Sequence, residues 1–175
     1  VRDGPLGLQV FMVARHRAIE FASGALVFPG GKVDPEDVAL AGGDAETAAR
    51  VAAVRETYEE CGVLLARGRG GEALALSADR RPFHARLQEE GFEPALAALT
   101  PFAHWITPTI LPKRFDTRFY IVAAPADQDA LHDGGEAVDS LWIEPARALA
   151  EAAEGRHTLV LPTRLNLELL GQSAS

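Results

Sequence analysis

The apolar residues of this chain fall into short strand-like runs that interleave with longer helix-like stretches. The short runs are rich in β-branched and aromatic residues and are bounded by glycine, proline or aspartate, which is typical of strands between turns. The clearest begins at Asp116, and another follows the turn Asp133-Gly134-Gly135. The pattern predicts strands at residues 8–15, 25–28, 103–107, 116–124 and 137–143.

The helix-like stretches are marked by residues suited to their ends. The longest spans 45–61, with Asp44 as a suitable N-cap and Gly62 placed to end it in a left-handed conformation. Further helices are predicted at 78–90, at 94–99, from Pro145 onward and at about 161–170. Strands and helices mixed without regular βαβ spacing fit an α/β fold. A chain of 175 residues is long enough for one core, so we predict a single domain over residues 1–175.

Composition and charge limit the kinds of partner and the cellular compartment that we expect for this protein. The hydrophobic share of 47% and the charged share of 24% are ordinary for a globular protein, and the single cysteine excludes an internal disulfide. No apolar run reaches the roughly 18–20 residues that span a bilayer. A net charge of −8 disfavours nucleic-acid polymers but is compatible with a small phosphorylated substrate. We therefore expect a cytoplasmic protein without a membrane or nucleic-acid partner.

Three carboxylates in the long predicted helix suggest a site for a cation. Glu56, Glu59 and Glu60 stand at i, i+3 and i+4, so they share one helix face. A hard divalent cation such as Mg²⁺ prefers oxygen ligands and would offset their mutual repulsion. Upstream, Pro29-Gly30-Gly31 forms a turn in which the backbone can pass close to a ligand. The alternative is a solvated acidic helix face.

The segment Arg55–Val63, preceded by Phe28-Pro29-Gly30-Gly31, resembles the Nudix box, whose consensus is Gly-x5-Glu-x7-Arg-Glu-U-x-Glu-Glu-x-Gly-U with U aliphatic. Thr57 replaces the first aliphatic residue, and the early glutamate position holds Thr47. An insertion at about 34–44 lengthens the box loop, and Glu46, one position off, is a candidate replacement for the missing glutamate.

Further blocks resemble the branch of peroxisomal coenzyme A diphosphohydrolases. They lie around residues 15–17, 21–34, 105–108 and 114–119, although Glu20 stands where the coenzyme A signature has arginine. The resemblance implies an α/β/α sandwich with a mixed sheet, and hydrolysis of a diphosphate bond in a nucleotide derivative with Mg²⁺ or Mn²⁺. Coenzyme A or acyl-coenzyme A is the favoured substrate. The alternatives are ADP-ribose or another nucleoside diphosphate derivative, or a non-catalytic ligand sensor. The resemblance also leaves open whether the protein forms a homodimer.

The same resemblance suggests roles for individual residues. Glu56, Glu59 and Glu60 would hold the metal, with a backbone carbonyl at Gly30 or Gly31 as a further ligand. Arg55 would orient the carboxylates through ion pairs.

A general base is also needed, because hydrolysis of a phosphoanhydride requires an activated water. Glu136 is the first candidate, Asp139 stands behind it, and Glu56 itself is the alternative.

Candidate substrate-binding residues lie outside the box. Arg114 and Arg118 are evenly spaced, so in an extended chain both point to one face, where a guanidinium fork could hold phosphate. The alternative is ion pairing with Asp116 or a nearby acid. Arg15 is a weaker candidate of the same kind. Trp105 either stacks on an adenine or belongs to the core.

Overall fold

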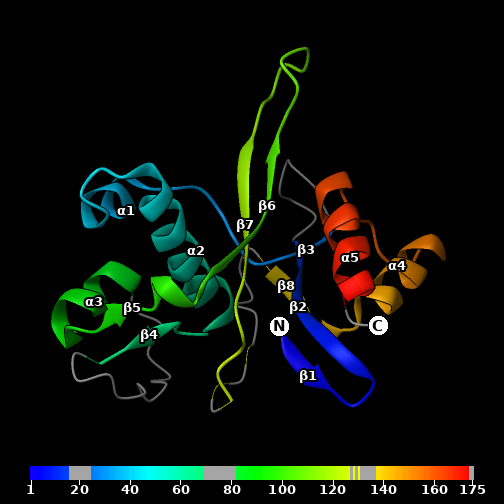
Figure 1. Cartoon of the computed structure of the whole chain (residues 1–175), viewed down its shortest axis with the longest axis horizontal. Helices are drawn as coiled ribbons and strands as arrows, with labels where there is room; N and C mark the ends of the chain where they lie inside the picture. The colour runs from blue at the N-terminus through cyan, green and yellow to red at the C-terminus, as the bar shows by residue number, and fades with distance from the viewer. Residues whose placement is uncertain (16–24, 69–81, 127, 129, 131–136, 174–175) are drawn as a thin grey trace.

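The computed structural model describes residues 1–15, 25–68, 82–126, 128, 130 and 137–173 (Figure 1). In chain order they form β1 Arg2–Gly4, β2 Gly7–Arg15, β3 Leu26–Val27, α1 Pro35–Leu40, α2 Ala45–Cys61, β4 Ala66–Arg67, α3 Phe83–Glu90, β5 Glu93–Pro94, a 3₁₀ turn Leu96–Ala98, β6 Thr100–Ile106, β7 Asp116–Ile121, β8 Ala137–Ile143, α4 Pro145–Ala153 and α5 Leu161–Ser173.

Strand β2 is the centre of the largest sheet. It pairs antiparallel with β1, β3 and β8, while β6 pairs with β7 and β4 with β5. A parallel bridge joins Ala25 to Thr158. The amide of Ala124, just past β7, donates to the carbonyl of Val1 at 2.7 Å, which ties the β6–β7 hairpin to the start of the chain.

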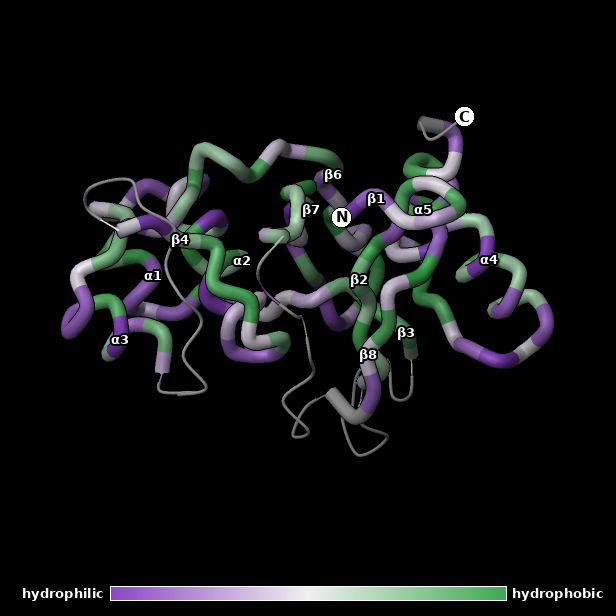
Figure 2. The backbone as a smooth tube through the Cα atoms, turned by 90° about the horizontal axis from the view of Figure 1, so that it is seen from below, coloured by the Kyte–Doolittle hydropathy of each residue, from purple (hydrophilic) through white to green (hydrophobic). Residues whose placement is uncertain are grey.

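Helices cover both faces of the central sheet. Figures 1 and 2 place α1, α2 and α3 on one side of β2, β3 and β8, and α4 and α5 on the other. Because neighbouring side chains of a strand point to opposite faces, β2 feeds two cores: Val13 packs with α2, and Met12 packs on the α4–α5 side. The predicted α/β class and its layered arrangement are confirmed.

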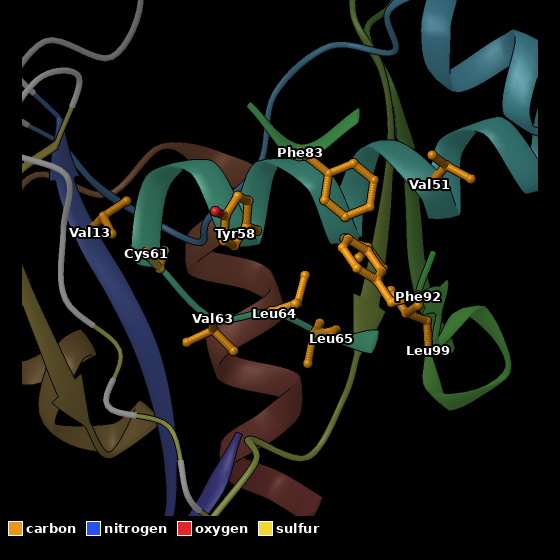
Figure 3. Close-up of a cluster of buried hydrophobic side chains, with 11 residues drawn as sticks. Val13, Val51, Tyr58, Cys61, Val63, Leu64, Leu65, Phe83, Phe92 and Leu99 are labelled. Atoms are coloured by element: carbon orange, nitrogen blue, oxygen red, sulfur yellow. The ribbon is translucent and has the colours of Figure 1, made fainter. Parts of the chain in front are cut away.

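The core on the α2 side holds the helix that carries the three glutamates. Val51 and Tyr58 of α2 pack there against Phe83, Phe92 and Leu99 (Figure 3). Both predicted ends of α2 are confirmed, since the carboxylate of Asp44 accepts from the Thr47 amide at 2.8 Å and Gly62 has φ +74°. One face of α2 is thus anchored, and its glutamates project from a fixed frame.

Several predicted boundaries differ from the structure. Residues 94–99 were expected to be helical, but Pro94 pairs with Ala66 and the Ala95 amide donates to Leu65 O at 2.9 Å, so pairing with β4 overrides helical propensity. The insertion at 34–44 contains a helix, α1, where a loop was expected. Helix α3 begins at Phe83; residues 78–81 of the predicted helix lie outside the described residues. Strands β1 and β4 were not predicted. Of the predicted elements, β6 begins earlier, β7 ends earlier and α5 ends later than expected.

Candidate active site

Arg55 is the centre of a compact charged cluster on α2. Its side chain is 6% exposed, and its Nη1 lies 2.9 Å from Glu59 Oε2 and 3.0 Å from Glu56 Oε1. The two carboxylates are therefore held by one guanidinium edge, as expected from the ion-pairing role suggested by the sequence. Burial tends to lower the pKa of Arg55, but the hydrogen bond to Asp37 and the charge of Glu56 raise it overall, so Arg55 stays charged.

The opposite edge of Arg55 faces Asp37, in the inserted helix α1. Arg55 Nε lies 3.1 and 3.2 Å from the two carboxylate oxygens of Asp37, and Nη2 lies 3.0 Å from Oδ2. Asp37 is 0% exposed, and it also accepts from the Asp34 amide at 2.8 Å and contacts His84 Nε2 at 3.0 Å. Burial raises the pKa of Asp37, but the hydrogen bonds from Arg55 and Asp34 outweigh it and leave the pKa below its usual value.

The Gly30–Lys32 turn packs directly on the glutamates. The Gly30 amide donates to Glu60 Oε2 at 3.0 Å, and the Lys32 carbonyl accepts from Arg55 Nη2 at 2.8 Å. A Cβ added to Gly31 would lie 2.2 Å from Glu56 Oε1, so a larger residue there would displace that carboxylate. The backbone of this turn therefore lies close to the glutamates, and its approach to a ligand stays a prediction.

The donor atoms of this cluster fit a hard divalent cation. They are carboxylate oxygens from Glu56, Glu59 and Glu60 beside the backbone of Gly31, which are the oxygen ligands that Mg²⁺ and Mn²⁺ accept. In the described part of the chain, no group of three or more His, Cys, Asp or Glu side chains is already arranged around a metal position. Glu59 is turned instead toward protein donors, with Arg55 on one oxygen and the Phe83 amide at 3.2 Å from the other.

Glu46 and Arg118 meet at the far end of α2. Glu46 pairs with Arg50 at 3.2 Å and Arg118 at 3.1 Å, and accepts from the Tyr120 hydroxyl at 3.0 Å. Glu46 and Arg118 line, with His104 and residues of β6 and β7, a pocket of about 290 Å³. Glu56 lies ten positions after Glu46 on α2, which is about 15 Å along the helix axis. The partners of Glu46 are thus Arg50 on α2 itself and two residues of the β6–β7 hairpin, and its role as a replacement for the box glutamate stays a prediction.

The remaining predicted substrate residues lie on strands or just before one. Arg114 precedes β7 and donates to Thr107 O at 3.2 Å, so the shared strand face predicted for it and Arg118 does not form. Trp105 is half-buried and donates to Asn166 Oδ1 at 3.1 Å. Arg15 ends β2 opposite Ala137.

The structure describes two of the three candidates for the general base. Glu136 lies outside the described residues. Asp139 is exposed on β8 opposite Ala14, and its Oδ1 accepts from the Ser140 amide at 2.8 Å. Glu56 lies within the cluster, paired with Arg55.

Comparison with known proteins identifies the family. The model of the NUDT19 Nudix domain matches residues 42–167. The chain belongs to the Nudix hydrolase family. Nudix hydrolases generally need a divalent metal, and the cluster on α2 lies at the box that defines them.

Two similar proteins with known names support membership in the Nudix family. The chain is 32% identical over 171 residues to the putative nudix hydrolase 7 of Caenorhabditis elegans, covering 94% of this chain and 56% of that protein. It is 31% identical over 136 residues to the human acyl-coenzyme A diphosphatase NUDT19, covering 65% of this chain and 34% of that protein. The chain thus spans about half or less of the length of these relatives.

A solved structure agrees with the fold as well. The crystal structure of a NUDIX hydrolase from Alicyclobacillus acidocaldarius has a TM-score of 0.87 and 30% identity, covering 98% of this chain and 87% of that one. In the part of this chain that the structure describes, no helix is both long and apolar enough to cross a membrane.

Sequence reasoning missed Asp37 and His84. A local signal for Asp37 existed, since Asp34-Pro35-Glu36-Asp37 has the spacing of a helix N-cap followed by an acidic residue at the third helical position. His84 carries no spacing signal, because its contact with Asp37 spans 47 residues.

Proposed function

We propose that this Nudix protein hydrolyses a diphosphate bond in a nucleotide derivative with the help of a divalent cation. The observation that carries the proposal is the buried Arg55, which holds Glu56 and Glu59 beside the glycine turn that packs on Glu60. A surface helix would not need a buried guanidinium to order its acidic face. The residues left partly accessible are carboxylates, which suit a cation shared with substrate phosphates.

Each residue of the cluster has a distinct part in this proposal. Glu56, Glu59 and Glu60 hold Mg²⁺ or Mn²⁺, together with the carbonyl of Gly31. The cation, when bound, neutralises charge on the phosphate oxygens and acidifies a water. Arg55 holds Glu56 and Glu59 close together, and Glu59 turns from its protein donors toward the cation.

The proton acceptor completes the reaction. Glu136 takes the proton from the attacking water in our proposal. Glu56, which pairs with Arg55 at 3.0 Å, is the alternative. Substitution of each residue separates the two assignments, since only the true base produces the acidic limb of the pH–rate profile.

Substrate identity rests on the relatives and on the pocket. Three proteins similar to this chain, from human, Xenopus laevis and Gallus gallus, are acyl-coenzyme A diphosphatases. We propose coenzyme A or an acyl derivative as the substrate, with the pocket beside Glu46 and Arg118 receiving a part of it remote from the reacting bond. Arg114, Arg15 and Trp105 stay proposed as outer contacts of the same substrate.

A panel of diphosphates tests the proposal. Coenzyme A, acetyl-coenzyme A, ADP-ribose, NADH, diadenosine polyphosphates and nucleoside triphosphates are incubated with and without Mg²⁺ or Mn²⁺. We expect metal-dependent release of two phosphate monoesters from a coenzyme A compound. Turnover should fall more than about 100-fold in the Glu59→Gln/Glu60→Gln variant. This is a larger loss than removal of a residue that only supports a metal ligand causes.

The matched control is Glu36→Gln, on the exposed surface of α1. Preferential cleavage of ADP-ribose would change the substrate assignment but leave the proposed reaction unchanged. Binding without turnover would indicate a sensor, although such a role does not require the three glutamates that this chain retains. Full activity in the Glu59→Gln/Glu60→Gln variant would refute the metal assignment.

A further inference from the structure

We propose that this protein forms a two-fold homodimer in which the tip of the β6–β7 hairpin of each copy packs on the α1 surface of the other. The tip is residues 107–115, and the α1 surface is formed by Val33, Val38 and Leu40. The inference goes beyond the proposed function and does not depend on it, because it concerns association and not the reaction.

The tip of the hairpin is an exposed apolar surface. Figure 1 shows β6 and β7 projecting past α1 and α5, so the tip is the part of the hairpin that lies farthest from the body of the fold. Ile110 is 88% exposed, and Ile106 and Leu111 beside it are also exposed. Apolar side chains gathered at the end of a projecting element are typical of a surface that binds a partner, because contact releases the water around them.

Hydrogen bonds within the tip hold it in one conformation. The Thr107 amide donates to Phe115 O at 2.9 Å, and the Phe115 amide donates to Thr107 Oγ1 at 3.0 Å. The Leu111 amide donates to Pro108 O at 3.2 Å and closes the turn. Because the tip is already ordered, it loses little conformational entropy on binding, which favours association.

The α1 surface is a second exposed apolar patch in the same chain. Val33, Val38 and Leu40 are 46%, 42% and 43% exposed. Figure 1 shows the tip and α1 well apart within one chain, so one copy cannot cover its own α1 surface with its own tip. A second copy can bring the two patches together.

The two patches carry opposite charge. Residues 107–115 contain Lys113 and Arg114, both exposed, and no acidic residue. Residues 33–44 contain four acidic residues and no basic one, and of the four only Asp37 is buried. Lys32, next to this segment, leaves the patch acidic overall. Apolar contact at the centre with opposite charges around it is the arrangement of a specific interface.

Charge also disfavours the other ways of covering the tip. Contact between two tips would bring Lys113 and Arg114 of both copies together, and like charges repel. The net charge of −8 opposes the approach of the whole chain to an anionic membrane surface. A second copy of the chain carries the acidic apolar patch that matches the tip.

Two-fold symmetry makes the contact larger and closes it. In a two-fold dimer each contact occurs twice, so both tips and both α1 surfaces are buried together. This doubles the buried area toward the roughly 1,200–2,000 Å² of stable interfaces. A one-sided contact would leave one tip and one α1 surface uncovered, and further copies would add to them without limit.

Sedimentation over a concentration series measures the association without substrate. We expect the wild type to sediment at twice the mass of one chain. Ile110→Asp/Leu111→Asp should sediment as a monomer with unchanged circular dichroism, because it places two carboxylates against the acidic patch. Leu161→Asp, at an exposed leucine of α5, is the matched control and should stay dimeric. The dissociation constant of the wild type should rise with salt concentration, since salt screens the opposite charges.

Cross-linking identifies the surfaces that meet. Cys61 is the single cysteine of the chain and is buried, so a cysteine introduced on the surface reacts alone. A short bismaleimide should join an equal mixture of Ile110→Cys and Val38→Cys into a covalent dimer. It should join neither variant by itself, because the tip of one copy meets α1 of the other.

Specific results would overturn the inference. A wild type that stays monomeric, or an Ile110→Asp/Leu111→Asp variant that stays dimeric, would show that the tip does not join two copies. Cross-linking of Ile110→Cys alone, or none in a mixture that is dimeric, would show that the tip does not meet α1. Monomeric protein that binds phosphatidylserine vesicles through Ile110 and Leu111 would assign the tip to a lipid surface. Failure to cleave any diphosphate would refute the proposed function and leave these results unaffected.

Discussion

Asp37 and Arg55 form an ion pair of two parallel contacts that is closed to solvent, with side chains 0% and 6% exposed. The pair joins an inserted helix to the helix that carries the box glutamates. Arg55 also pairs with Glu56 and Glu59, so the pair orders these glutamates from the side of α2 that faces α1. Asp37 stands six residues after Gly31, the spacing of the early glutamate in the box consensus.

Gly31→Ala should reduce turnover sharply with little loss of fold. The added Cβ would lie 2.2 Å from Glu56 Oε1, so the carboxylate must move away from the turn. We predict a fall in kcat/KM of about 100-fold or more, as for other displacements near 1 Å in an active site. Gly42→Ala is the matched control: nothing lies within 4 Å of its Cβ, and its φ of +61° predicts a small loss of stability alone. Activity retained by Gly31→Ala would show that Glu56 can act from another place.

The stability contributed by Asp37 should depend on pH with a defined sign. The pKa of Asp37 lies below its usual value, because hydrogen bonds from Arg55 and Asp34 outweigh the effect of burial. The contribution is therefore fully present above about pH 4, the unfolded value, and is lost as the pH falls through the lower native pKa. Urea unfolding should show Asp37→Asn less stable than the wild type by about 3–5 kcal/mol at pH 7.

The difference between the two proteins should shrink only below about pH 4, where the wild type loses its own paired carboxylate. A difference that instead grew toward acid pH would show that the native state prefers protonated Asp37.

A glutamate at position 47 should stabilise α2 without raising turnover. Thr47 occupies the third position of α2, where its amide donates to Asp44, so Thr47→Glu would complete a capping box. We predict a gain of about 0.5 kcal/mol in the free energy of unfolding. Turnover should stay unchanged, because Asp37 already occupies the edge of Arg55 that a box glutamate would support. Thr47→Gln controls for side-chain length, and a large rise in kcat for Thr47→Glu alone would show that Asp37 leaves Arg55 incompletely positioned.

Arg118→Gln should affect binding more than chemistry. Arg118 lies on the pocket of about 290 Å³ at the end of α2 remote from the glutamates, and its fork suits a phosphate of the substrate. We predict that KM rises about fivefold to tenfold while kcat stays within about twofold, the pattern of uniform binding. Arg67→Gln, at an exposed arginine of β4, is the control. An unchanged KM would assign Arg118 to its structural pairs with Glu46 and Asp116 alone.

The sequence predicted α2 with its ends and the glycine turn because those features depend on local rules. Asp44, Gly62 and the Gly30–Gly31 turn each follow from capping or turn chemistry within a few residues. The spacing of Glu56, Glu59 and Glu60 likewise follows from helical geometry.

Other features depend on contacts between distant segments, which a single sequence does not reveal. Pro94 joined a strand through Ala66, and Glu46 turned to Arg118 because the β6–β7 hairpin packs beside it. The partners of Asp37 were hidden for the same reason, because Arg55 and His84 are 18 and 47 residues away.

Hydrolysis in ¹⁸O-labelled water is the most direct measurement of the central claim. Acetyl-coenzyme A is incubated with the protein and Mg²⁺, and both phosphate products are examined by mass spectrometry. We predict two phosphate monoesters, one of them carrying a single ¹⁸O, and no such product without the cation or with Glu59→Gln/Glu60→Gln. Label found in orthophosphate instead, or equal product from the double variant, would contradict metal-assisted cleavage of the diphosphate bond at these glutamates.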